Sequence, residues 1–461
     1  MTHPNGRIRT DLSTIVGMRG FLASSIGVTC AAALALPLTL PTTSHAAPTP
    51  AQESLPGSTQ SLPLTPAPAS RAVGTPQEQG LQRRDVRPFS LVGVVWDDPD
   101  DVLHGHVQVR TRTTGTATWS AWQDVETHND DAPDPDTPER TSGHVRGSTA
   151  PLWVGDSDGV EVRVKADAPA ATRAADRTGA LPKGLRLELV DPGDEPPPQG
   201  APADGPRATG LSAETAASSA VNAELAPLGA LAVPALTKEA TEDEVIEARG
   251  GEPDATKARP YVGARPRIIT RKGWGADEKL RERDFAYTKT VKAAFVHHSA
   301  SGNNYRCSQA PSVIRSIYRY HVKSSGWRDI GYNFLVDKCG NIYEGRAGGI
   351  AKPVMGAHTL GFNTNSMGVA VLGSFGGANP PAAAVNAIAK LTAWKLGLYG
   401  ANPRGTTYLK SGGGNLYRKG KNVRLHVISG HRDGFATECP GRRLYNKLGK
   451  ARSSSAHLQG R

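Results

Sequence analysis

Three short stretches decide the fold class and the candidate chemistry of this chain: Phe295-Val-His-His-Ser-Ala300, Asp329-Ile-Gly-Tyr-Asn-Phe334 and Gly430-His-Arg-Asp-Gly-Phe-Ala-Thr-Glu-Cys-Pro-Gly441. The first stretch ends an apolar run that is typical of a buried strand, and the third directly follows another such run. Together they supply imidazoles, a phenol and one thiol. Catalytic zinc sites use three protein ligands and leave one position open for water. We therefore predict one metal site from these stretches.

The alternation of side chains along the strand expected at 291–298 decides which histidine faces that site. His297 and His298 point to opposite faces, so one ion cannot easily bind both. His431 and Cys439 are eight residues apart, in a glycine-containing loop that can fold back on itself. With His297 they would form a His₂Cys set that leaves net positive charge on a bound Zn²⁺. A lone histidine at a strand end is more often a structural hydrogen-bonding group, and the residues alone leave this alternative open.

Residues 261–451 have the pattern of an α/β domain, with a central mixed β-sheet flanked by helices. Pro311 stands in the first turn of one expected helix, and Gly400 ends the other. Apolar runs bounded by turn residues predict the strands, and longer periodic segments predict the helices. The strands are expected at 291–298, 333–337, 342–344, 367–372 and 423–429, and the helices at 308–323 and 381–399.

Residues 85–191 predict a small all-β, sandwich-like accessory domain. Period-two alternation of apolar and charged residues is clearest at 159–165 and 185–190. The segment 127–146 is crowded with Asp and Pro, so we expect an exposed loop there. Four tryptophans in this domain belong either to its core or to a sugar-stacking platform; they are Trp96, Trp119, Trp122 and Trp153.

Composition assigns the remaining segments. Residues 47–84 are rich in Pro, Ser, Thr, Ala and Gln and predict a disordered linker. Residues 192–260 predict a second, Pro- and Ala-rich linker, with weak helix around 239–248. Residues 452–461 predict a polar tail.

Residues 1–46 have the features of a signal peptide. Three arginines accompany the apolar stretch Phe21–Leu40, and Ser44-His-Ala46 offers a small-x-small cleavage pattern. An uncleaved membrane anchor and a lipoprotein attached through Cys30 are the alternatives. No other stretch is long and apolar enough to span a bilayer. We expect a secreted, cell-wall-associated protein without stable membrane insertion after cleavage.

The net charge of +11 is unevenly distributed. Residues 261–461 carry 32 Lys or Arg and 9 Asp or Glu, whereas residues 1–260 carry 22 and 34. A basic C-terminal part favours an anionic target. For an exported protein an anionic cell-wall polymer is the expected partner rather than nucleic acid, and plain solubility is the alternative explanation.

The cysteine count bears on the same site. Once Cys30 leaves with the signal peptide, Cys307, Cys339 and Cys439 remain, and an odd number in an exported protein needs an explanation. One disulfide between Cys307 and Cys339, with Cys439 as a metal-bound thiolate, is the economical answer. Three unrelated buried thiols are the alternative, which an oxidising compartment disfavours.

With these motifs in order, residues 265–450 resemble the peptidoglycan recognition protein family, also described as the type-2 N-acetylmuramoyl-L-alanine amidases. The resemblance covers about two-fifths of the chain and leaves the β-domain and the linkers outside it. Its motifs are Gly273-Trp-Gly275, Phe295–Ala300, Tyr320-His321, Gly326-Trp327, Asp329–Phe334, Tyr343-Glu-Gly-Arg346, Gly356-Ala-His-Thr359, Asn365-Ser-Met-Gly368, Gly430–Asp433 and Thr437–Gly441.

The resemblance implies roles for five residues. His297, His431 and Cys439 would bind zinc, Tyr332 would contact the substrate carbonyl or the attacking water, and Thr437 would occupy the polar catalytic position. Family members that bind peptidoglycan without cleaving it typically lack the cysteine, so its presence favours an enzyme. From the residues alone, a packed strand aromatic would be the preferred reading of the tyrosine. The resemblance also implies a disulfide between Cys307 and Cys339.

The resemblance also implies a substrate type. Gly326-Trp327 with Arg346 resembles the version of the family that prefers diaminopimelate at the third stem position. An arginine can pair its fork with the extra carboxylate that diaminopimelate has and lysine lacks. The alternative to a substrate-binding role is that Trp327 is a core residue and Arg346 forms an ion pair at the surface. Three further residues are expected to line the same groove: His321, His358 and Asn363.

These observations predict a secreted, zinc-dependent amidase that hydrolyses the bond between N-acetylmuramic acid and L-alanine in diaminopimelate-type peptidoglycan. A protein that binds peptidoglycan without cleaving it is the main alternative. A wall-anchored structural protein that adheres through its β-domain is a third.

Overall fold

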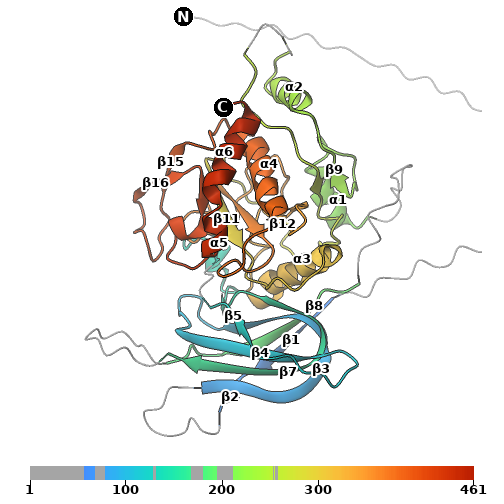
Figure 1. Ribbon diagram of the computed structural model, residues 1–461, viewed down its shortest axis with the longest axis vertical. Helices are drawn as coiled ribbons and strands as arrows, with labels where there is room; N and C mark the ends of the chain where they lie inside the picture. The colour runs from blue at the N-terminus through green and yellow to red at the C-terminus, as the bar shows by residue number, and fades with distance from the viewer. Residues whose placement is uncertain are drawn as a thin grey trace, which may run out of the picture. The chain divides into compact units, whose positions relative to one another are not determined.

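The computed structural model describes residues 57–67, 78–127, 131–167, 180–194, 211–252, 254 and 258–461 (Figure 1). The expected signal peptide and Cys30 lie outside the described residues, as do large parts of the two expected linkers. Within the described ranges no helix has the length and apolar character needed to cross a membrane.

The N-terminal domain is one antiparallel sheet whose long strand β3 (Glu78–Trp96) pairs with four others. Burial alternates along β7 (Leu152–Ala166), where Val160, Val162 and Val164 face the core. The sheet confirms the predicted all-β domain. Its order is β1 (Ser58–Pro63), β8 (Arg186–Asp191), β3, β7 (Leu152–Ala166), β4 (Gly105–Thr113) and β5 (Gln123–Val125), and β2 (Thr65–Pro66) and β6 (Gly147–Ser148) also pair with β3.

A seven-stranded sheet forms the centre of the C-terminal domain. It mixes parallel and antiparallel neighbours, since β11 (Ala293–His298) is parallel to β14 (Ser366–Val371), whereas β12 (Phe334–Val336) is antiparallel to β13 (Ile342–Glu344). This confirms the predicted α/β class. The order is β17 (Ile428–Gly430), β11 (Ala293–His298), β14 (Ser366–Val371), β12 (Phe334–Val336), β13 (Ile342–Glu344), β10 (Ile268–Ile269) and β9 (Ala232–Val233).

The strand expected at 423–429 is two strands in the structure. Asn422–His426 is β16, which forms a separate hairpin with β15 (Thr406–Lys410), and Ile428–Gly430 joins the main sheet as β17. Val427, between them, donates to Gly405 and accepts from Ala294, so the chain changes sheets at this residue. A continuous apolar run cannot reveal that change of partner.

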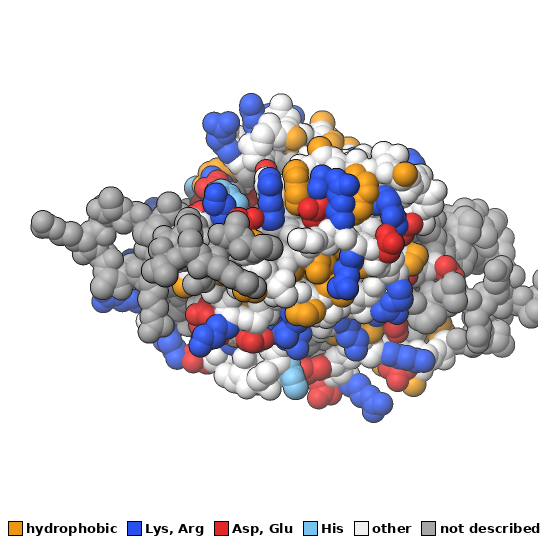
Figure 2. Space-filling view, turned by 90° about the horizontal axis from the view of Figure 1, so that it is seen from below, with side chains coloured by type: hydrophobic (Ala, Val, Ile, Leu, Met, Phe, Trp, Pro, Cys, Tyr) orange, Lys and Arg blue, Asp and Glu red, His pale blue; other side chains and the backbone are white. Residues whose placement is uncertain are grey.

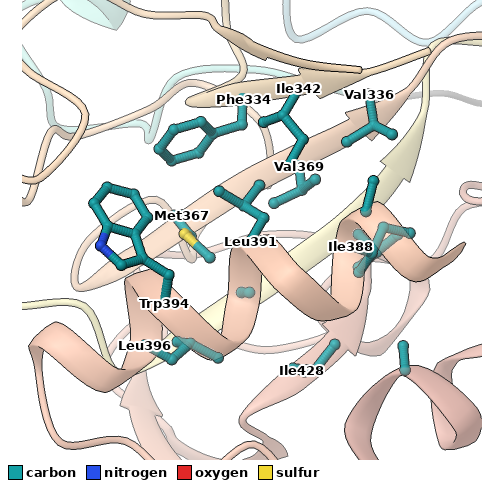
Figure 3. Packing of buried hydrophobic residues seen from close by; sticks show 14 of the residues in the cluster. Phe334, Val336, Ile342, Met367, Val369, Ile388, Leu391, Trp394, Leu396 and Ile428 are labelled. Carbon is teal, nitrogen blue, oxygen red and sulfur yellow. The ribbon is translucent and has the colours of Figure 1, made fainter. Parts of the chain in front are cut away.

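Two helices cover opposite faces of the central sheet. α4 (Ala382–Leu398) buries Ile388, Leu391 and Trp394 against side chains such as Val369 and Ile428 (Figure 3). α3 (Ala310–Arg319), which begins with Pro at its first turn, packs on the alternate side chains, such as Ala370 and Leu372. The period-two alternation of β14 thus separates the two layers.

Ordered elements occupy part of the segments predicted to be linkers. β1 pairs with β8 over six residues within 47–84. Within 192–260, α1 (Ala213–Ala220) and α2 (Lys238–Ala248) form, each capped by the hydroxyl of a Ser or Thr at its N-terminus, and β9 adds a strand to the central sheet. The helix α2 confirms the weak helix predicted around 239–248. Low apolar content concealed β1, α1 and β9, because packing, not local sequence, stabilises them.

The segment 452–461, predicted to be a polar tail, belongs to α6 (Leu448–Gln459) except for its last two residues. This helix packs against α4 (Figure 1) and buries polar residues that find partners there. The Thr392 hydroxyl donates to Ser455 at 3.0 Å, and the Gln459 amide donates to the Ala393 carbonyl at 2.9 Å. A hydrogen-bonded Ser or Gln can be buried at little cost, so polarity misled the prediction.

The two domains share one hydrophobic cluster. Leu91 and Trp153 of the β-domain are buried together with Trp274, Ile314 and Tyr320 of the C-terminal domain. The Tyr320 hydroxyl also donates to the carbonyl of Thr149 across the boundary, at 3.1 Å. The contact between the domains is therefore a packed core rather than a loose surface contact.

Candidate metal centre and groove

His297, His431 and Cys439 lie together in the structure, as the sequence predicts. One ligand atom from each lies within 4.8 Å of the others, and all three side chains are buried. The two imidazole rings have centroids 4.5 Å apart, and the thiol sulfur is 3.7 Å from Nδ1 of His297. No other group of this kind occurs among the described residues.

The local structure explains why these residues meet. His297 is on β11, and the chain leaves β17, which pairs directly with β11, into a 3₁₀ turn at His431–Asp433. The Asp433 carboxylate holds this turn by accepting from the amide of Gly430 at 2.9 Å and from the Tyr445 hydroxyl at 2.6 Å. The loop then returns, and the amide of Arg432 donates to the carbonyl of Cys439 at 3.1 Å.

His298 does not join the cluster, in agreement with the predicted alternation. Its Nδ1 accepts from the amide of Phe375 at 3.2 Å, on the other side of β11. The two adjacent histidines therefore have different environments, one structural and one in the candidate site.

The electrostatics fit a divalent cation. Burial, with the neighbouring His298, lowers the pKa of His297 to about 3, and burial lowers the pKa of His431 well below its usual value. Both rings are therefore neutral, the form that binds metal. Burial also raises the pKa of the Cys439 thiol, which a bound dication would reverse.

Hydrogen bonding at the two rings supports the same fit. The Thr359 hydroxyl lies 3.3 Å from Nε2 of His297, which orients this ring with Nδ1 toward the cluster. Neither ring nitrogen of His431 forms a hydrogen bond, although both are buried. Buried polar atoms are normally satisfied, so this ring suits a metal ligand.

Tyr332 borders the cluster, with its ring centroid 5.5 Å from that of His297. Its hydroxyl donates to Asp131 Oδ2 at 2.5 Å. The other carboxylate oxygen of Asp131 lies 3.0 Å from Nδ1 of His297 and 3.4 Å from Nδ1 of His431. A carboxylate from the β-domain therefore lies at the candidate metal centre.

Arg346 is buried rather than exposed, which contradicts the surface ion pair considered as an alternative. Its fork makes two bonds to the Glu139 carboxylate, at 2.8 and 2.9 Å, and its Nε donates to the Ile330 carbonyl at 2.8 Å. Burial lowers the pKa of Arg346, but the charge and hydrogen bonds of Glu139 outweigh this and raise it. The guanidinium is therefore fully charged and already paired.

Gly326 and Trp327 lie against the same segment of the β-domain. Trp327 is in a small buried cluster with Val145 and Ala357. Gly326 has a φ of +74°, and a Cβ there would lie 1.9 Å from the carbonyl oxygen of His144. Only glycine allows this close approach of the two backbones.

The remaining predicted groove residues are buried and hydrogen-bonded. His321 stacks on Trp327 with centroids 4.3 Å apart and accepts from the amide of Gly331 at 3.1 Å. Burial, with a contribution from Arg346, lowers the pKa of His321 to about 3. His358 has its Nδ1 3.0 Å from the Thr359 hydroxyl.

Asn363 and Thr437 support the surrounding loops. The Asn363 side chain accepts from the amide of His358 at 2.7 Å and donates to the Ala132 carbonyl at 2.9 Å. The Thr437 hydroxyl accepts from the amide of Cys439 at 3.2 Å, which holds the loop that carries the thiol. A catalytic role for Thr437 stays a prediction.

Two further predictions have clear outcomes. Cys307 and Cys339 form a disulfide, and Cys439 is a free buried cysteine, as the cysteine count suggested. The four tryptophans do not form one platform. Trp96 and Trp153 are buried, whereas Trp119 and Trp122 are half-buried and stack with arginines such as Arg110.

The main error of sequence reasoning concerns the segment 127–146, which was expected to be an exposed loop. In its described part, 131–146, Asp134, Glu139 and Val145 are buried, and Asp131 contacts the candidate ligands His297 and His431. The uneven charge of the two halves of the chain, interpreted above as a sign of an anionic polymer target, is also consistent with such a contact. It could not identify the residues, because their partners are about 200 positions away.

Each of the two domains matches a known protein family. The family described as N-acetylmuramoyl-L-alanine amidase matches residues 287–442, and a Rv3811 N-terminal galactose-binding domain-like family matches residues 47–182. The chain is 30% identical over 183 residues to peptidoglycan-recognition protein SC2 of Drosophila melanogaster, which covers 39% of this chain and 84% of that protein.

Two other similarities cover the same part of the chain. Human N-acetylmuramoyl-L-alanine amidase is 31% identical over 202 residues, which is 42% of this chain and 30% of the human protein. A crystal structure of peptidoglycan recognition protein-LE in complex with tracheal cytotoxin is 31% identical, with a TM-score of 0.32, and covers 40% of this chain and 92% of that chain.

Proposed function

Because this chain belongs to the family of peptidoglycan-recognition proteins and N-acetylmuramoyl-L-alanine amidases, we propose that it is a catalytic amidase. It hydrolyses the amide bond between N-acetylmuramic acid and L-alanine in peptidoglycan. The observation that carries this proposal is the complete His297, His431 and Cys439 cluster. A binding protein without catalysis does not need a thiol beside two neutral imidazoles.

These three residues would hold a zinc ion, which supplies a Lewis acid and lowers the pKa of a bound water. Thr359 orients the ring of His297 from its far nitrogen. The Tyr332 hydroxyl, which donates to a carboxylate in this structure, is placed to donate to the oxyanion that develops on the substrate carbonyl. Thr437 would hold the cysteine loop and assist as a second donor.

Arg346 supports a preference for diaminopimelate-type stem peptides. Its two-bond pairing with a carboxylate at 2.8 and 2.9 Å is the geometry in which a guanidinium would recognise the extra carboxylate of diaminopimelate. A lysine-type stem lacks this group and would leave a buried cation unpaired, which is costly.

The amidase is tested by incubating the full chain with purified diaminopimelate-type peptidoglycan and analysing soluble products by mass spectrometry. Stem peptides with a free L-alanine amine are expected, and a chelator should abolish their release. A Cys439→Ser variant is the matched control because it changes one sulfur to oxygen at a buried position. Binding to the wall without release of such peptides would support recognition alone.

Export and association with the cell wall are part of the proposal. The Cys307–Cys339 disulfide supports an oxidising compartment, and the substrate lies outside the membrane. N-terminal sequencing of protein recovered from culture medium tests it, with an N-terminus near residue 47 expected. A protein found only inside cells would contradict it.

An anionic wall polymer as a second partner rests on the basic residues of 261–461. Figure 2 shows the side of the molecule on which the β-domain lies in Figure 1, with Lys and Arg interspersed with Asp and Glu, so it does not bear on the basic residues of 261–461. Binding to anionic polymer that falls with rising salt would support this partner.

A further inference from the structure

One segment of the β-domain, residues 131–146, contacts several residues of the predicted metal site and groove. Asp131 meets the two histidine ligands and Tyr332, and Glu139 meets Arg346. Residues 144–145 lie against Gly326 and Trp327. These residues come from different strands and loops of the C-terminal domain. They have in common that they belong to the predicted metal site and substrate groove.

The segment also uses the backbone that surrounds the groove. The Asp134 carboxylate accepts from the amide of Gly361 and from the Asn363 side chain, both at 2.7 Å. The Glu139 carboxylate also accepts from the amide of Arg328 at 3.1 Å. Three carboxylates of one short segment thus lie buried along the groove, each with donors from the C-terminal domain.

We propose that residues 131–146 are an autoinhibitory segment that occupies the substrate groove and competes with the substrate for it. Glu139 takes the place of the diaminopimelate carboxylate on Arg346. Asp131 takes the place of the substrate carbonyl or water. One of its carboxylate oxygens would be a fourth ligand to a bound zinc ion, and the other accepts from the Tyr332 hydroxyl. This inference rests on the proposed function for the identity of the displaced ligand.

The segment has the chemistry of a competitor rather than of a substrate. Like a stem peptide it carries several carboxylates, and Pro133, Pro135 and Pro138 restrict its backbone. A chain restricted in this way loses less conformational entropy when it occupies the groove. It offers the site no muramyl amide to hydrolyse.

Activation requires release of the segment, not separation of the domains. Leu91 and Trp153 of the β-domain are buried in a core shared with α3, so separating the domains would expose a large apolar surface. Within 131–146 only Val145 belongs to a hydrophobic cluster of the described residues. Local release therefore exposes little apolar surface and exchanges ion pairs and hydrogen bonds for those of the substrate.

The test measures binding and metal coordination in the full chain, independently of turnover. Asp131→Ala and Glu139→Gln remove the two key carboxylates, and Asp136→Asn is the matched control. Asp136 is in the same segment but pairs with Lys419 at the exposed surface. Calorimetry with a diaminopimelate-type muramyl tripeptide should show binding at least roughly tenfold tighter for the first two variants than for wild type and the control.

The visible spectrum of the Co²⁺-substituted protein provides a second readout. Asp131→Ala should change the ligand-field bands, because one ligand is exchanged, whereas Asp136→Asn should not. Unchanged or weaker tripeptide binding in Asp131→Ala overturns autoinhibition, and so does an unchanged spectrum. If Glu139→Gln does not fold, Asp131→Ala decides by the same criteria.

These outcomes are separable from the failure of the amidase proposal. If no variant releases stem peptides but Asp131→Ala binds the tripeptide more tightly, the segment blocks a recognition groove and the enzyme proposal is wrong. If wild type releases peptides as fast as Asp131→Ala and binds the tripeptide equally well, the enzyme proposal stands and autoinhibition is wrong.

Discussion

The two faces of the central sheet use the same alternation of side chains for different purposes. The face under α4 is an apolar core formed by residues such as Val369, Ile388 and Leu391 (Figure 3). The opposite side of β11 presents His297 to a buried polar site. The difference shows that the stability of the domain and its proposed chemistry depend on separate sets of side chains, and mutations can test that separation.

The largest expected effect on chemistry comes from Cys439→Ser. Changes next to a metal ligand cost 10–100-fold, so loss of a ligand should reduce peptide release by more than roughly 100-fold. Zinc content by mass spectrometry of the native protein should fall, while the thermal midpoint of the metal-free protein changes little. Release at the wild-type rate with one bound zinc would remove Cys439 from the site.

Leu391→Ala tests the apolar face. Deleting a fully buried leucine side chain should destabilise the domain by about 2–5 kcal/mol, as measured by denaturant unfolding. Peptide release per folded molecule at low temperature should stay at the wild-type level. A specific loss of turnover in folded protein would mean that the two faces are coupled, and the comparison would break.

Two buried arginines sharpen the comparison within the polar part of the domain. Arg271 pairs with Glu278 and Asp329 of its own domain, whereas Arg346 pairs with Glu139 of the β-domain segment. Replacement by lysine keeps the charge but removes the fork. Arg271→Lys should lower stability without changing substrate preference.

Arg346→Lys, in contrast to Arg271→Lys, should change substrate preference. Loss of a two-bond contact should reduce the preference for diaminopimelate-type over lysine-type tripeptide by roughly tenfold, as measured by calorimetry. The Arg271→Lys protein is the control for general disturbance. Equal preference in both variants would show that Arg346 is a structural residue only.

The smallest effect concerns pH. Burial raises the pKa of Asp134 to about 6, although hydrogen bonds from Gly361 and Asn363 oppose this. Folding therefore favours the protonated carboxyl, so its contribution is fully present below about pH 4 and is lost as pH rises through 6. In the wild type the free energy of unfolding should therefore fall by up to about 3 kcal/mol between pH 4 and 6 because of Asp134. In Asp134→Asn this part of the fall should be absent.

Asp136→Asn is the control for this pH measurement, because its carboxylate is exposed and pairs with Lys419. Its stability curve should follow that of the wild type. Identical slopes in Asp134→Asn and wild type would mean that Asp134 titrates normally and that the segment is not buried in solution.

Local patterns predicted the elements that position the metal cluster. The helix with Pro311 in its first turn, the strand at 342–344 and the long helix ended by Gly400 are all present within a few residues of their expected bounds. These predictions succeeded because capping, proline and periodicity act over one to four residues. The opposite orientation of His297 and His298 followed from the same short-range rule.

The sequence by itself therefore determined the fold class, the pairing of Cys307 with Cys339 and the three residues of the candidate metal site. Only the tertiary structure brought Asp131 and Glu139 into the groove, divided one apolar run between β16 and β17, and buried a polar helix against α4. The physical reason is the separation along the chain of the residues that interact. A buried carboxylate is stable only where a distant donor meets it, and the path of the whole chain decides where that happens.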